Sequence, residues 1–71
     1  MSAMQSTAIE RIYYSARRHE LFVAFRSGRV YVYFGVPGDE YRAFENAESI
    51  GRYFNARIRD HYDYRELKAS A

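Results

Sequence analysis

Two apolar stretches joined by a glycine-containing turn constrain the fold of this 71-residue chain most strongly. The stretch Leu21–Phe25 reads "LFVAF", and the stretch Arg29–Gly35 reads "RVYVYFG". Both are rich in β-branched and aromatic residues, which favour strands. Ser27-Gly28 lies between them, and glycine tolerates the positive φ that a tight turn requires. The two stretches therefore predict an antiparallel β-hairpin.

The length of the hairpin loop decides on which sheet face Tyr31 and Tyr33 lie, because a shift of one residue exchanges the side chains between faces. A three-residue loop at 26–28 places both tyrosines on the same sheet face as Leu21 and Val23, whereas a two-residue loop places them on the other face. We predict the three-residue loop and a position in the core. The alternative is a platform on which single-stranded bases stack.

The remaining periodicity predicts an α+β fold, with a three-stranded antiparallel sheet followed by two short helices packed on one face (β-β-β-α-α). Residues 8–14 form the expected first strand. Pro37 fits the first position of one helix, and Asn46 can end this helix in the left-handed conformation. Ser49 is the expected N-cap of the second helix. The expected buried face of the second helix carries Ile50, Tyr53, Phe54 and Ile58.

Residues 8–66 are expected to form a single domain, with flexible ends at 1–7 and 67–71. The sequence contains no cysteine, so neither a disulfide nor a cysteine-based metal site can supplement the core. The longest apolar run is much shorter than a membrane span, and the N-terminal residues lack the pattern of a signal peptide. We therefore expect a cytoplasmic protein without cofactor, bound metal or membrane contact.

Acid–base catalysis has little support in the sequence. His61 with Asp60 or Asp63, and His19 with Glu20, could form proton-transfer pairs. Neither a serine-centred elbow nor a phosphate-binding glycine loop accompanies them. We therefore expect a binding module and not an enzyme.

The second predicted helix presents an arginine-rich face. At 100° per residue, Arg52, Asn55 and Arg59 fall within one stripe opposite the buried positions. Arginine binds phosphate in a bidentate manner and stacks on bases, so two arginines and an asparagine on one face can grip phosphates and reach a base edge. The alternative is an ordinary solvated helix face. Arg57 lies at an angle inside the apolar face, so either the helix ends near it or its stem lies along the core.

The sheet face that does not carry Tyr31 and Tyr33 in the predicted register is also apolar. In the three-residue-loop register this face carries Phe22 and Val32. An uncovered apolar sheet face is uncommon on a monomer and usually marks an interface. It therefore predicts either a protein partner or a homodimer.

The chain resembles the KTSC domain family in the residues Ile12 and Tyr14, in "LFVAFRSGRVYVYFGVP" (21–37) and in "NAESIGRYFNARIRDHY" (46–62). The resemblance covers residues 8–66, and the Tyr-x-Tyr pair is the central mark of the family. The family is named for its occurrence at the C-terminus of some lysyl-tRNA synthetases and also occurs as a stand-alone bacterial protein. In relatives the residue between the two tyrosines is often charged, whereas here it is Val32.

The resemblance implies RNA binding, with tRNA or another structured RNA as the ligand, and it implies no aminoacylation because no synthetase catalytic region is present. A bacterial or phage origin fits so small a stand-alone domain. The leading hypothesis is a non-enzymatic RNA-binding module, and the alternative is a protein-interaction or homodimerisation module that uses Phe22 and Val32. The expected RNA contacts are Arg52, Asn55 and Arg59, with support from Arg57, Arg17 and Arg18.

Overall fold

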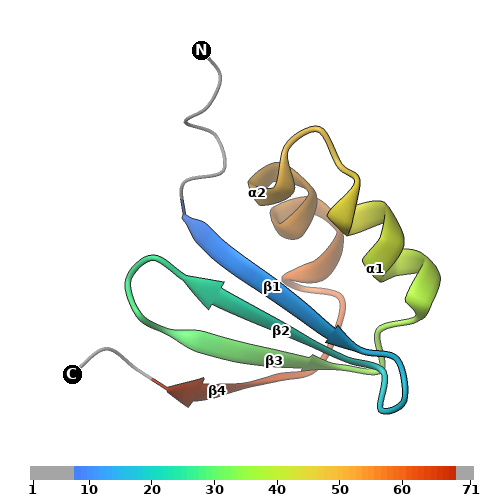
Figure 1. Ribbon diagram of the computed structural model, residues 1–71, viewed down its shortest axis with the longest axis horizontal. Helices are drawn as coiled ribbons and strands as arrows, with labels where there is room; N and C mark the ends of the chain where they lie inside the picture. The colour runs from blue at the N-terminus through green and yellow to red at the C-terminus, as the bar shows by residue number, and fades with distance from the viewer. Residues whose placement is uncertain (1–7, 69–71) are drawn as a thin grey trace.

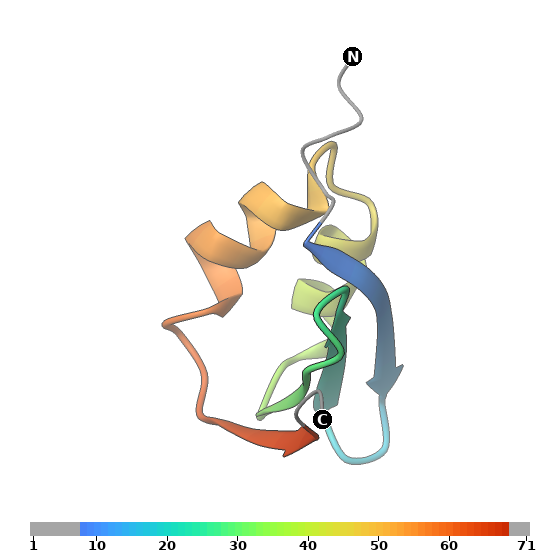
Figure 2. The same ribbon diagram turned by 90° about the vertical axis from the view of Figure 1, so that its left-hand side faces the viewer.

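A four-stranded antiparallel sheet carries the helical segments on one face, here called the inner face (Figure 1, Figure 2). The computed structural model describes residues 8–68, so the expected flexible end 1–7 and residues 69–71 of the expected flexible end 67–71 lie outside this range. The predicted α+β class is confirmed, whereas the prediction of three strands is wrong. The strands, in sheet order, are β1 (Ile9–Ser15), β2 (Glu20–Phe25), β3 (Val30–Phe34) and β4 (Tyr64–Lys68). The helical segments are α1 (Gly38–Glu45), α2 (Ile50–Tyr53) and the π-helical turn η2 (Phe54–Ile58), which continues α2.

The strand that the sequence prediction misses is β4. It pairs antiparallel with β3, and Tyr64 lies opposite Tyr33. The strand includes Leu67 and Lys68, which the sequence prediction places in a flexible end. Its sequence, YRELK, contains three charged residues without a strict alternation of charged and apolar positions, and so resembles a solvated segment. Charged side chains are nevertheless common on edge strands, because they discourage pairing with another sheet.

The predicted three-residue loop of the hairpin is confirmed. The N–H of Phe25 donates to the carbonyl oxygen of Arg29 at 2.9 Å, and the N–H of Gly28 donates to the carbonyl oxygen of Phe25 at 2.9 Å. Gly28 has a φ of 98°, which residues with a Cβ rarely adopt. The loop therefore fixes the register that the sequence favours.

Tyr31 and Tyr33 consequently lie on the inner face. Tyr31 is opposite Val23, and Tyr33 is opposite Leu21. Both aliphatic partners are fully buried beneath the helical layer. The predicted face of the two tyrosines is therefore confirmed.

A bulge adjusts β1 to the same inner face. The pairing with β2 shifts between Ile9 and Arg11, so Glu10 is an extra residue. An extra residue reverses the alternation of side chains along a strand. As a result, Ile9 and Ile12 both pack against the core.

Helix α1 begins one residue later than predicted. Pro37 is its N-cap, and its carbonyl oxygen accepts the N–H of Glu40 at 3.0 Å and that of Tyr41 at 3.1 Å. Asn46 ends the helix with a φ of −97°, so the predicted left-handed ending is wrong. The side-chain amide of Asn46 instead donates to the carbonyl oxygen of Arg42 at 2.9 Å, which satisfies a terminal helix acceptor.

The second helix begins as predicted but does not remain α-helical. The Ser49 hydroxyl accepts the N–H of Arg52 at 3.2 Å and so caps α2. From Phe54 onward the chain forms η2, in which the N–H of Arg59 donates to the carbonyl oxygen of Phe54 at 2.8 Å. This bond spans five residues and widens the turn, so the residues beyond it depart from a regular α-helical stripe. Phe54 and Ile58 remain buried.

The core lies between the inner face and the helical layer. Five side chains are fully buried: Leu21, Val23, Val36, Phe44 and Ile58. Burial of a side chain of this kind contributes about 1.5–3 kcal/mol. Within residues 8–68, no helix has the length and apolar character that crossing a membrane requires.

A carboxylate joins α1 to the other helical segments. Glu40 Oε2 accepts the hydroxyl of Tyr53, and Glu40 Oε1 accepts the hydroxyl of Tyr62 at 2.9 Å. Burial and the hydrogen bond to Glu40 raise the pKa of Tyr62 to about 12. Glu40 therefore holds α1 against both α2 and the segment that leads into β4.

The sheet face away from the helices, here called the outer face, is only partly exposed. Tyr13 is 62% exposed and Phe34 is 38% exposed. Phe22 is half-buried, and its ring centroid lies 5.9 Å from that of Tyr13. Val32 is only 4% exposed, because Phe22 and Arg65 flank it on the neighbouring strands. The expected exposure of Val32 is therefore wrong.

Candidate functional site

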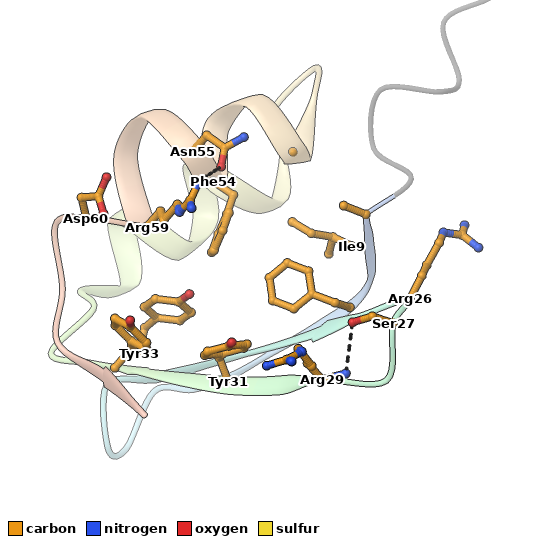
Figure 3. A pocket seen from close by; sticks show the side chains of 14 residues that line it. Ile9, Arg26, Ser27, Arg29, Tyr31, Tyr33, Phe54, Asn55, Arg59 and Asp60 are labelled. Atoms are coloured by element: carbon orange, nitrogen blue, oxygen red, sulfur yellow. Dashed lines mark hydrogen bonds between the residues drawn. The ribbon is translucent and has the colours of Figure 1, made fainter. Parts of the chain in front are cut away.

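The helical layer leaves part of the inner face open. A groove of about 570 Å³ lies between strands β3 and β4 on one side and the α2–η2 segment on the other (Figure 3). The first residues of β1 and the loop between β2 and β3 line one end of it. The groove brings together both tyrosines of the Tyr-x-Tyr pair and part of the arginine-rich helix face. Six of its lining residues are Tyr31, Tyr33, Phe54, Asn55, Arg59 and Tyr64.

The aromatic side chains of the groove differ in exposure. Tyr33 is 4% exposed and packs edge-on against Phe54, with ring centroids 5.5 Å apart and an interplanar angle of 81°. Tyr64 is 58% exposed, and its ring centroid lies 5.7 Å from that of Tyr31. Tyr31 is half-buried. Tyr33 is therefore the floor of the groove, while Tyr31 and Tyr64 form an accessible aromatic wall.

Burial raises the pKa of the Tyr33 hydroxyl to about 12, with further contributions from the neighbouring hydroxyls of Tyr31 and Tyr64. The hydroxyl is therefore neutral at physiological pH and can donate a hydrogen bond. Within residues 8–68, the hydroxyls of Tyr33 and Tyr64 form no hydrogen bond with another protein group. Both remain available to a ligand.

Cationic side chains stand at two rims of the groove. Arg59 lies on the helical side, where its Nη1 donates to Asn55 Oδ1 at 3.4 Å. Arg26 and Arg29 lie on the hairpin loop (Figure 3). Arg29 pairs with Glu66 at 3.1 Å, and its pKa is raised by the Tyr31 hydroxyl and by the charge of Glu66.

Two of these three cations form no salt bridge within residues 8–68. They are Arg26 and Arg59, and both are exposed. Asp60 also lines the groove and partly offsets their charge.

The structure divides the predicted arginine-rich face into two parts. Asn55 and Arg59 line the groove, whereas Arg52 lines a shallow hollow of about 260 Å³ on the other side of α2. Arg57, which the prediction places outside this face, lines the same hollow. The Arg57 guanidinium lies 5.7 Å from the centre of the Tyr53 ring, so its stem follows the core while its charge reaches solvent. The π-helical turn contributes to this division, because it changes the angular spacing of the residues after α2.

Arg17 and Arg18 do not join the groove. They lie in the turn between β1 and β2, at the opposite end of the sheet from the hairpin loop that lines it (Figure 1). Arg18 forms an exposed ion pair with Glu20 at 3.6 Å. Phe22 and Val32 lie on the outer face, away from the groove.

The candidate acid–base pairs are not assembled into a site. Of their members, Asp60 lines the groove, whereas His61, Asp63 and His19 do not. In the described part of the chain, no three histidine or acidic side chains gather in a way that could hold a metal ion.

The sequence prediction does not assign Arg26, Arg29 or Tyr64 to a functional site, although all three line the groove. Arg26 belongs to the predicted loop and Arg29 begins the predicted third strand, and the position of this hairpin relative to the second helix is not visible in the sequence. Tyr64 could be assigned to the site only after β4 had been recognised as a strand beside β3.

Comparisons with known proteins agree on one family. The model of the KTSC domain matches residues 5–62. A protein of Stutzerimonas stutzeri, described as uncharacterized, is 36% identical over 63 residues, which are 87% of this chain and 89% of that protein. The crystal structure of a KTSC domain protein from Yersinia pestis has a TM-score of 0.85 and 32% identity, and the match covers 89% of both chains.

One relative is a larger protein. A lysine–tRNA ligase of Nostoc punctiforme is 32% identical over 63 residues, which are 89% of this chain but 11% of the ligase. The similarity therefore concerns a small part of the ligase.

Proposed function

The chain belongs to the KTSC domain family, and from this premise we propose that it is a small non-enzymatic module that binds RNA through the groove. One observation supports the proposal most directly: the accessible aromatic wall, Asn55 and Arg59 all line the same groove. Aromatic rings hold bases by stacking, and arginine and asparagine contact phosphates and base edges. One relative is a lysine–tRNA ligase, so tRNA is the first RNA to test.

The groove replaces the continuous helix face as the proposed contact surface. Arg59 and Arg26 supply the charge in this proposal. Arg52, Arg57, Arg17 and Arg18 lie outside the groove, so they act at most by long-range attraction of the RNA.

The test is a titration of a tRNA pool against wild-type protein at several salt concentrations. Replacing Arg26 and Arg59 together with glutamine should weaken binding and reduce the salt dependence by about one counterion for each lost phosphate contact. The matched control replaces Arg17 and Arg52 with glutamine, which removes the same charge outside the groove. Binding no stronger than that of a protein without basic patches would end the proposal.

A second candidate function is association through the outer face, where Tyr13 and Phe34 are exposed beside Phe22. Burial of apolar surface stabilises such a contact by about 25 cal/mol per Å². A homodimer should then be visible by light scattering at micromolar concentrations, and Phe22→Glu should yield a monomer. A wild-type protein that remains monomeric removes the homodimer from consideration.

A further inference from the structure

We infer that the groove takes an unpaired nucleotide, so that the RNA recognised is a single-stranded end, loop or bulge and not a duplex. This inference rests on the proposed function and names the substrate class of the same site. The base is stacked on Tyr64 and Tyr31, and the phosphates that flank it lie near Arg26 and Arg59.

The first step concerns the stacking surface. Tyr64 is the most exposed aromatic residue of the groove, at 58%, and it lies beside Tyr31 and Tyr33 with centroid distances of 5.7 and 5.5 Å. A base must expose one of its flat faces to use this wall. In a duplex both faces are covered by neighbouring base pairs, so sequence-specific RNA recognition relies on unstacked bases in loops, bulges and ends.

The second step concerns the edge of the base. Asn55 Oδ1 already accepts a hydrogen bond from Arg59, so the amide nitrogen of Asn55 is left to donate elsewhere. The hydroxyls of Tyr33 and Tyr64 have no partner within residues 8–68. The groove therefore offers hydrogen-bond donors and acceptors to a base whose pairing edge is free.

The third step concerns charge and size. Arg59 lies on the helical segment and Arg26 on the hairpin loop, where the Arg26 side chain extends outward from the groove (Figure 3). A strand that crosses between them places a phosphate near each cation and its base over the aromatic wall. The volume of about 570 Å³ lies in the range of small-molecule sites, which suits one nucleotide better than the side of a double helix.

The experiment measures fluorescence anisotropy of a labelled oligouridine strand and of a blunt RNA duplex of equal length. Wild-type protein should bind the single strand more tightly at moderate salt. Tyr64→Leu should weaken single-strand binding by about 5- to 150-fold, the range expected for loss of one base stack, and should leave duplex binding unchanged. Tyr64→Phe keeps the ring and should retain most of the affinity.

Tyr13→Leu is the matched control, because Tyr13 is a strand tyrosine of similar exposure, 62%, on the outer face. Thermal unfolding of each variant checks the fold. Photocrosslinking of thiouridine RNA to wild-type protein gives a readout that needs no variant, and the crosslinks should map to Tyr31 or Tyr64.

Equal affinity for strand and duplex, equal losses in Tyr64→Leu and Tyr13→Leu, or crosslinks away from the groove would each overturn the inference. The proposed function would survive such a result if replacing Arg26 and Arg59 still weakened RNA binding. Absence of all RNA binding would instead remove the proposed function itself.

Discussion

Tyrosines gather at both ends of the helical layer, but within residues 8–68 the two ends differ in the hydrogen bonds of the tyrosine hydroxyls. At the α1 end, Tyr14 stacks on Tyr41 with centroids 4.6 Å apart, and its hydroxyl donates to the Val36 carbonyl oxygen at 2.6 Å. The hydroxyls of Tyr53 and Tyr62 both donate to Glu40. We call this the closed end, and the groove between η2 and β3–β4 the open end.

At the open end the tyrosines are packed on one another without any such acceptors. Tyr33 and Tyr64 lie 5.5 Å apart, yet their hydroxyls have no partner within residues 8–68. The tyrosines of the two ends therefore differ in the hydrogen-bond acceptors that surround their hydroxyls and not in residue type. A single carboxylate, Glu40, provides two of these acceptors at the closed end.

The largest expected effect concerns Tyr33, which lies at the open end but is buried. Tyr33→Ala should lower the free energy of unfolding by about 3–5 kcal/mol, because it removes a packed ring from the core. A domain of this size has about that much stability in total, so the variant should be largely unfolded at room temperature. Chemical denaturation monitored by circular dichroism measures the loss.

The matched comparison for this prediction is Tyr64→Ala on the adjacent strand. Because Tyr64 is mostly exposed, its replacement should lower the free energy of unfolding by about 1 kcal/mol or less. A stable Tyr33→Ala protein with near-native thermal unfolding would mean that the floor of the groove is not part of the core.

The next effect concerns the carboxylate of the closed end. Glu40→Gln should lower the free energy of unfolding by about 1–2 kcal/mol, because a neutral amide replaces a charged acceptor of two hydroxyls at a half-buried position. The control is Asp39→Asn in the same helical turn, whose carboxylate is exposed and pairs only with Arg42. Equal stability of the two variants would remove the distinction between the two ends.

An alkaline titration separates the causes of the raised tyrosine pKa values. Tyr33 and Tyr62 both have a pKa of about 12 in the folded protein, compared with 10.0 as the ordinary value. The neutral hydroxyls favour the folded state, so the stability that they contribute is present below pH 10 and is lost as the pH rises through about 12.

Glu40→Gln should lower the pKa of Tyr62 only in part, because burial is the larger cause there and the hydrogen bond to Glu40 is the second. It should leave the pKa of Tyr33 unchanged, because burial and other neighbours, and not Glu40, raise it. The phenolate absorbance of Glu40→Gln is titrated against pH, once alone and once combined with Tyr62→Phe. The difference between the two curves is the Tyr62 signal. A Tyr62 titration that Glu40→Gln does not change would contradict the assigned role of Glu40.

The smallest effect is expected for the ion pair at the open end. Arg29 and Glu66 are 3.1 Å apart at the surface, and solvent screens their attraction, so Glu66→Gln should leave the free energy of unfolding nearly unchanged. The same variant frees the Arg29 guanidinium beside the groove and should strengthen RNA binding at low salt. Weakened RNA binding in this variant would show that Glu66 positions Arg29 and does not merely compete for it.

The elements that the sequence predicts correctly are those whose signals are local. The hairpin loop at 26–28, the Ser49 cap and the buried positions Phe54 and Ile58 follow from turn chemistry, capping and periodicity. The resemblance to the KTSC domain family is confirmed as well, and these features together place Tyr31 and Tyr33 on the inner face.

The elements that the sequence does not predict depend on distant contacts. β4 has the composition of a solvated segment and becomes a strand only because β3 offers it an unpaired edge. The widened turn of η2 has no local sequence mark, so a regular helical wheel groups Arg52 with Arg59 although they line different hollows. Tyr31 and Tyr33 share the two-residue alternation of β3, so this alternation does not explain why their exposed fractions differ. The difference follows from where the helical layer ends.

The late position of β4 in the chain also has a kinetic consequence. The pairings of β1 with β2 and of β2 with β3 join neighbours in sequence, whereas the pairing of β3 with β4 closes a loop that contains the whole helical segment. Closing a longer loop loses more chain entropy, so this strand is expected to dock last during folding and to detach first in the native state. Because β4 carries Tyr64, the aromatic wall would then be assembled and dismantled by a motion that leaves the remaining sheet intact.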